Sequence, residues 1–305
     1  MKLQSMLFIA ATTFSTVGLY SGEKAETAVL PSEAVVMTAD ELWHPFQFFR
    51  QVEKNSALDF SSNLDAPAGK YGRVIAGRNG RLVFQNNPER PVRFFGANLA
   101  FNAQFPENKS DAEELAERFS HMGFNLVRIH HHDDRMSARP GSRTRFDSDA
   151  VDRLNYLISC FRKRGIYYTT DGYVSRQVYP ELRLPEPGRI VSPDEYKALI
   201  YINDEVFRDF IDWTIDFLSR TNPYTGLALK DDPALITFSL VNEGNPMAVW
   251  KKTPRTRKLY QAEFKKYLRT HPKATMSSFF NKLASRRYLE SKSELRARGI
   301  DIPLS

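Results

Sequence analysis

The 305-residue sequence is poor in cysteine, with Cys160 as its only thiol, and this scarcity excludes a disulfide within the chain. Cys160 lies in a segment of helical periodicity, so we expect a small buried residue and not a nucleophile. The sequence also lacks an arginine-rich arm and any nucleic-acid-binding motif, although its net charge is +7. We therefore interpret the basic clusters at 251–258 and 286–298 as solvated surface and expect no nucleic acid partner.

The sequence also lacks an apolar run as long as a membrane helix, which needs roughly 20 residues. Its N-terminal apolar stretch, Met6 to Tyr20, is shorter than that and follows Lys2. This pattern is typical of the apolar core of a signal peptide. We therefore predict a signal peptide over 1–25, a secreted or periplasmic location, and no stable membrane insertion.

A glycine-rich phosphate loop is missing after the first predicted strand, and this argues against a complete open sheet of the nucleotide-binding kind. Instead, buried strands alternate with amphipathic helices, which predicts parallel strands joined by right-handed crossovers. The predicted strands are 94–99, 124–130, 166–170 and 234–241, and the predicted helices among them are 110–122, 149–164 and 203–221. A fifth strand begins near 300–304, after helical stretches at 257–270 and 276–298.

Four strand–helix units and the start of a fifth are about half of what a (β/α)8 barrel requires. The predicted fold class is therefore α/β, a TIM-barrel type of which the first half is present, preceded by a β-hairpin formed by 81–84 and 92–95. We divide the chain into a signal peptide (1–25), an N-terminal extension with the hairpin (26–92), and a partial barrel (93–305).

The last predicted barrel strand ends in Leu240-Val241-Asn242-Glu243, which places an amide and a carboxylate directly after a buried run. Barrel enzymes keep their chemistry at this carboxyl end of the strands. Glu243 is therefore the candidate catalytic residue, with Asn242 beside it. The alternative is an Asx-type turn in which Glu243 is merely solvated.

Arg128 lies inside the apolar run of the second strand, where an unpaired guanidinium would be costly, so it must face a carboxylate. Strand-end carboxylates such as Glu243 are natural partners, although a purely structural ion pair is an alternative. His130 comes two residues later and therefore points to the same face. Asp171 and Tyr173 end the third strand, and Trp250 follows the Asn-Glu turn, where it could stack on a sugar ring.

The run His130-His131-His132-Asp133-Asp134 contains metal-binding residue types. Neighbouring strand residues face opposite ways, however, and a catalytic zinc site usually has three protein ligands. We therefore expect no metal or other cofactor, and assign His130 to contact a sugar or to orient a carboxylate.

The strand-end Asn242-Glu243, the inward Arg128 and the nearby His130 together resemble the glycoside hydrolases of clan A, above all family 5, the cellulase-like family. Segments 63–72 and 91–99 are similar to the lead-in of its bacterial secreted members. The resemblance implies a retaining glycosidase acting on a carbohydrate. Glu243 would be the acid/base, Asn242 would hold the 2-hydroxyl, and Arg128 would orient the nucleophile.

The sequence departs from this pattern because the resemblance places the nucleophile on a seventh strand. The later glutamates Glu263, Glu290 and Glu294 lie on helical stretches and cannot substitute. We therefore expect a fragment or a truncated product, without turnover from residues 1–305 alone. Two other functions stay open: a non-catalytic carbohydrate-binding protein, and a metal-dependent hydrolase that uses the histidine cluster.

Overall fold

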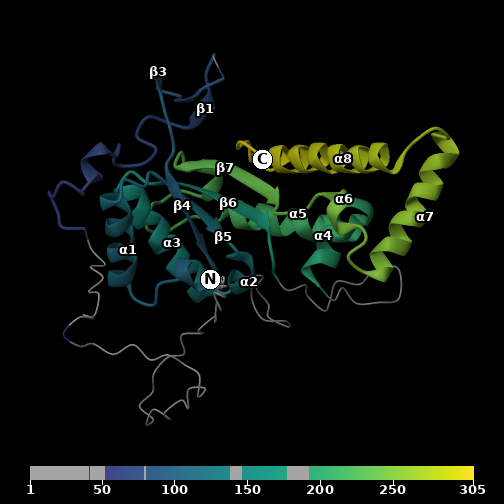
Figure 1. Ribbon diagram of the computed structural model, residues 1–305, viewed down its shortest axis with the longest axis horizontal. Helices are drawn as coiled ribbons and strands as arrows, with labels where there is room; N and C mark the ends of the chain where they lie inside the picture. The colour runs from purple at the N-terminus through teal and green to yellow at the C-terminus, as the bar shows by residue number, and fades with distance from the viewer. Residues whose placement is uncertain (1–40, 42–51, 79, 138–145, 177–191) are drawn as a thin grey trace, which may run out of the picture. The chain divides into compact units, whose positions relative to one another are not determined.

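A four-stranded parallel sheet organises the computed structural model, which describes residues 41, 52–78, 80–137, 146–176 and 192–305 (Figure 1). The strands are β4 (Gly96–Ala100), β5 (Leu126–His130), β6 (Tyr167–Tyr173) and β7 (Leu235–Val241), and they lie side by side in the order of the sequence. Every neighbouring pair is parallel. A doubly wound sheet reverses its strand order, so this sequential order is that of the first half of a barrel.

Helices α1 (Lys109–His121), α3 (Ser148–Lys163) and α5 (Asp204–Ser219) connect these strands, as predicted. Helix α4 (Pro193–Ile202) is not among the helices predicted from the sequence. Its start is conventional, since Ser192 caps the first turn and Pro193 occupies the first helical position. Four short helices complete this part: η1 (Ser61–Asn63), η2 (Phe101–Gln104), α2 (Asp133–Met136) and η3 (Leu229–Asp231).

Three helices after β7 form a separate cluster with α4. They are α6 (Pro246–Val249), α7 (Pro254–Thr270) and α8 (Met276–Ala297), and both long ones begin with a capping box. Tyr260, Phe279 and Phe280 are buried here against Ala198 and Val249. The hairpin of α7 and α8 therefore has an apolar core of its own, next to α4 and α6 (Figure 1).

The predicted β-hairpin is a three-stranded antiparallel sheet of β1 (Val74–Ala76), β2 (Leu82–Phe84) and β3 (Asn87–Pro91). The prediction of 92–95 as the second strand is wrong, because 87–91 pairs with β2 instead, across a bulge at Val83 and Phe84. Phe84 stacks on Tyr167 at 5.6 Å, and Phe94 meets the same ring edge-on at 5.7 Å. This small sheet therefore packs on the start of β6, away from the carboxyl ends of the strands.

The last residues return to β7 on the edge opposite β6. Phe238 donates its backbone N–H to Pro303, and Ser305 donates back to Phe238, at 2.9 and 3.0 Å. Leu304 forms a parallel bridge with Phe238, which confirms the predicted start of a fifth strand. Cys160 is buried, also as predicted.

Two predictions concern residues outside the described ranges, namely the signal peptide at 1–25 and the first part of the extension, up to residue 51 apart from residue 41. Within the described ranges, no helix has the length and apolar character needed to cross a membrane.

Candidate active site

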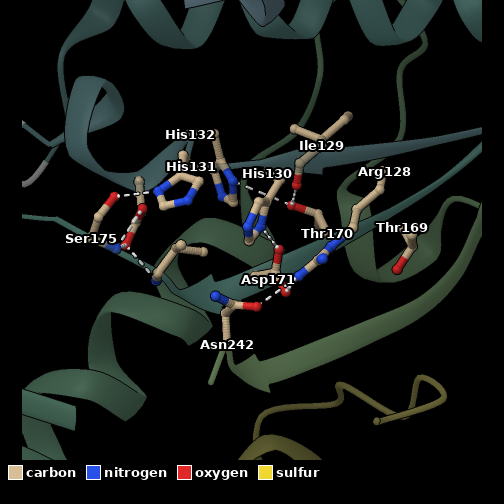
Figure 2. A network of polar contacts seen from close by, with 12 residues as sticks. Arg128, Ile129, His130, His131, His132, Thr169, Thr170, Asp171, Ser175 and Asn242 are labelled. Carbon is tan, nitrogen blue, oxygen red and sulfur yellow. Dashed lines mark hydrogen bonds and ion pairs between the residues drawn. The ribbon is translucent and has the colours of Figure 1, made fainter. Parts of the chain in front are cut away.

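Four of the predicted site residues meet where β5, β6 and β7 end (Figure 2). Arg128 and His130 come from β5, Asp171 comes from β6, and Asn242 directly follows β7. The strands are parallel, so their carboxyl ends lie at one edge of the sheet. The side chains of this network point toward one another from three neighbouring strands (Figure 2).

Asp171 is the centre of the network and is 1% exposed. Its Oδ1 accepts a hydrogen bond from Nη2 of Arg128 at 2.9 Å, and its Oδ2 lies 2.8 Å from Nδ1 of His130. A carboxylate only accepts, so Nδ1 of His130 carries the proton of that bond. The predicted carboxylate partner of Arg128 is therefore Asp171, and the suggestion that Glu243 fills this role is wrong. His130 orients a carboxylate, as predicted.

Asn242 extends the network toward Glu243. Its backbone N–H donates to Tyr173 at 2.9 Å and prolongs the pairing of β6 with β7 by one residue. Its side-chain oxygen accepts from Nη2 of Arg128 at 3.0 Å. Its Nδ2 makes no hydrogen bond within the described residues, so that donor is free for a ligand.

Glu243 occupies a strained turn, with φ of 51°, in the left-handed region that side chains rarely adopt. It is exposed, and its carboxylate has no hydrogen bond or ion pair to any described residue. Gly244 is required next to it, since a Cβ there would lie 2.4 Å from Cγ1 of Val241. Asn245 then caps α6 by accepting from the N–H of Met247. The chain thus fixes an unpaired carboxylate beside the network.

The three consecutive histidines do not converge on one point (Figure 2). His131 lies 2.9 Å from Oγ of Ser175, whereas His132 is buried and stacks on Phe217. Burial lowers the pKa of both His131 and His132 below the usual histidine value. Among the described residues, no group of three or more His, Cys, Asp or Glu side chains is arranged to hold a metal ion.

Two residues that were predicted to contact the substrate pack against other side chains of the protein instead. Tyr173 is fully buried and stacks on Tyr196 of α4 at 4.4 Å, so the prediction of a ligand contact for Tyr173 is wrong. The guanidinium of Arg176, which is also buried, lies 4.8 Å from the centre of the Tyr173 ring. Trp250 is half-buried and packs against Phe280 at 5.7 Å, instead of standing free as a stacking surface.

Asp133 is fully buried, and its role could not be recognised from the sequence. Its carboxylate accepts the backbone N–H groups of Val174, Ser175 and Arg176, with the shortest contact to each between 2.8 and 3.0 Å. It therefore fixes the segment that follows β6. Its position among histidines suggested a metal ligand, and only the folded chain shows what it binds.

Several known proteins that are similar to this chain are named mannanases or mannosidases. No protein-family model matches the chain. Over 235 residues it is 23% identical to a putative mannan endo-1,4-beta-mannosidase 9 of Oryza sativa subsp. japonica, an alignment that covers 73% of this chain and 51% of that protein.

Two solved structures are also similar to the chain, at lower sequence identity. An endo-1,4-beta-mannanase from Rhizomucor miehei has a TM-score of 0.40 and 16% identity, covering 56% of this chain and 47% of that one. A glycoside hydrolase family 5 mannosidase from the same organism has a TM-score of 0.41 and 18% identity, covering 58% and 49%. The chain spans about half the length of the rice protein. By its motifs and by this relative, the chain resembles the glycoside hydrolases of family 5.

Proposed function

We propose that the chain contributes the acid/base part of a retaining glycoside hydrolase, with Glu243 as the acid/base and β-1,4-linked mannan as the substrate. The observation that carries the proposal is the placement of Glu243. Its exposed and unpaired carboxylate directly follows Asn242, which is tied through Arg128 to Asp171. The choice of mannan follows the name of the rice relative. We also propose that the protein is exported, on the strength of its apolar N-terminal stretch.

Each residue then has a defined task. Glu243 donates a proton to the departing sugar oxygen and later removes one from the attacking water. Asn242 directs its free Nδ2 at the sugar 2-hydroxyl, while its oxygen is held by Arg128. Asp171 fixes Arg128 and His130 in place. A retaining mechanism also requires a second carboxylate about 5–5.5 Å from the first, and that part of the proposal rests on the family resemblance alone.

The test compares the chain with its Glu243→Gln variant on mannan and on aryl β-mannosides, with and without azide. Azide is included because a small anion can replace a missing carboxylate nucleophile. We expect turnover with azide, and under that condition the variant should be at least about 100-fold slower on mannan and on aryl groups that leave poorly, because those oxygens need a proton. A dinitrophenyl group leaves without help, so its release should be much less affected.

The control is Glu263→Gln, which removes a surface carboxylate of α7 that is paired with Lys266. Its rates should equal those of the unaltered chain. Turnover that is the same in the chain and in Glu243→Gln contradicts the assignment of Glu243. Binding of mannan without turnover in either condition would instead favour a non-catalytic carbohydrate-binding protein.

A further inference from the structure

Positive charge is concentrated in the hairpin of α7 and α8, where acidic residues are scarce. Between 251 and 298 there are fifteen of the 43 lysines and arginines but three of the 36 acidic residues, which is a net charge of +12. The rest of the chain therefore carries a net charge of −5. So uneven a distribution creates a local positive potential that a net charge of +7 does not reveal.

Most of this charge is uncompensated by neighbouring carboxylates. Some cations form ion pairs, such as Arg287 with Asp204 and Arg296 with Asp301. The cations without an ion pair among the described residues are Lys251, Arg257, Lys258, Lys265, Arg269, Lys273, Lys282, Lys292 and Arg298. All of these except Lys292 are exposed. An ordinary solvated surface intersperses both signs of charge, and this one does not.

On α7 the free cations form a line. Lys258, Lys265 and Arg269 are spaced seven and four residues apart, which places them on one face of the helix. With a rise of 1.5 Å per residue, they extend over roughly 16 Å of the helix axis. A line of like charges of this length suits an extended polymer with repeated negative groups better than one small anion.

Between the two helices lies a pocket of about 410 Å³, to which Lys266, Lys282 and Arg286 contribute their charges. Its two carboxylates, on Asp204 and Glu263, are already bound by Arg287 and Lys266. Lys282 has no such partner and lies 5.0 Å from the centre of the Tyr267 ring. The pocket therefore keeps an excess of positive charge, and can accept a side group of a polymer that lies on the hairpin.

We propose that this hairpin binds an acidic polysaccharide, a glycan that carries carboxylates along its length. The choice of a carbohydrate rests on the proposed function, because the hairpin begins just after Glu243 and packs on α4 and α6. Helices that bind bilayers show large apolar residues on one face, and single-stranded nucleic acids need exposed aromatic platforms. Among the described residues, α7 has no exposed large apolar side chain, and α8 has Tyr288 and Leu289.

The test measures the binding of the chain to polygalacturonate, neutral mannan, single-stranded DNA and phosphatidylglycerol vesicles. The key variant combines Lys258→Gln, Lys265→Gln and Arg269→Gln. We expect it to bind polygalacturonate about tenfold more weakly or worse, and the affinity of the unaltered chain to fall steeply between 50 and 200 mM salt, as neutralised charges predict. The matched control, Lys54→Gln with Arg81→Gln and Lys163→Gln, removes as much exposed charge elsewhere and should change affinity by less than twofold.

An equal loss in both triple variants overturns the proposal, because net charge alone would then explain binding. Tighter binding to DNA or to vesicles than to polygalacturonate overturns it as well. The hydrolysis of neutral mannan separates this inference from the proposed function. A chain that binds polygalacturonate through α7 without cleaving mannan would refute the activity and leave the hairpin's role intact.

Discussion

Asp171 uses both carboxylate oxygens to hold two neighbouring side chains from the adjacent strand, and it is almost completely buried. Replacing it with asparagine keeps the shape but gives an NH2 group that cannot accept from Arg128 or His130. We expect Asp171→Asn to lower the free energy of unfolding by about 2 kcal/mol, because hydrogen bonds to a charged group are lost in a buried site. Urea denaturation measures this loss.

The same chemical change at the surface provides the control. Asp231 pairs with Lys230 at 3.0 Å but is half exposed, so Asp231→Asn should alter stability by less than about 0.5 kcal/mol. Similar losses in both variants would show that Asp171 is not the anchor that its contacts indicate.

His132 is a second residue whose burial has a measurable effect. Its lowered pKa means that the folded chain resists protonation, whereas the unfolded chain takes up a proton below about pH 6.5. Stability contributed by neutral His132 is therefore complete above that pH and is lost as the pH falls. The unfolding free energy of the unaltered chain should fall between pH 7 and pH 5. In His132→Phe we expect this fall to be smaller by up to about 2 kcal/mol.

His132→Phe is a suitable variant because the ring already stacks on Phe217 and Thr170 keeps its hydrogen bond to Ile129. His131 also has a lowered pKa and supplies a remaining part of the pH dependence. An unchanged difference between the two pH values would mean that the pKa of His132 is the same in the folded and the unfolded chain.

The sequence predicted that Arg128 needs a carboxylate but not which one. A guanidinium inside an apolar run was expected to be buried and to need a partner on electrostatic grounds, whereas the side chain is 39% exposed. Strand alternation placed His130 on the same face. Selecting Asp171 over Glu243 depends on the register of β5 against β6 and on the backbone turn at 243. Neither can be obtained from one sequence, because both arise from contacts between distant segments.

At the scale of elements, Asp133 links the end of β5 to the segment after β6. Asp133→Ala removes the acceptor of three buried backbone N–H groups at 174–176. We expect hydrogen exchange at these three amides to accelerate at least about tenfold, while exchange within 126–130 changes little. Uniform acceleration throughout the chain would indicate global destabilisation instead. In Asp133→Asn, which keeps an acceptor oxygen, the exchange rates of these amides should lie between those of the unaltered chain and of Asp133→Ala.

Elements with a strong repeating pattern were predictable, and those governed by local caps or bulges were not. The apolar runs of β5 and β7 and the helix α3 lie within a few residues of their predicted positions. Helix α4 was missed because it follows a proline- and arginine-rich segment, although Ser192-Pro193 is a sound start signal. Strand β3 was missed because Asn87-Pro88-Glu89-Arg90-Pro91 is typical of a turn, yet it pairs as an edge strand.

For the molecule as a whole, the sequential order of β4 to β7 was predicted from the alternation of strands and helices together with the missing glycine-rich phosphate loop. The separate apolar cluster of α4, α6, α7 and α8 could not be predicted in the same way. Tyr260 and Phe280 are far apart in the sequence from Ala198, and their periodicity indicates a buried face without identifying what covers it. The concentration of positive charge, in contrast, was visible but had been interpreted as solvated surface.

Both ends of the segment that holds α7 and α8 are attached to one strand. The chain leaves β7 at Val241 and comes back to hydrogen-bond with Phe238 on its other side. Both attachments limit how far the hairpin can tilt as a body, and therefore how far its basic line can move relative to Glu243. A higher salt concentration should therefore weaken the binding of an acidic polysaccharide to the hairpin without changing the turn that holds the Glu243 carboxylate.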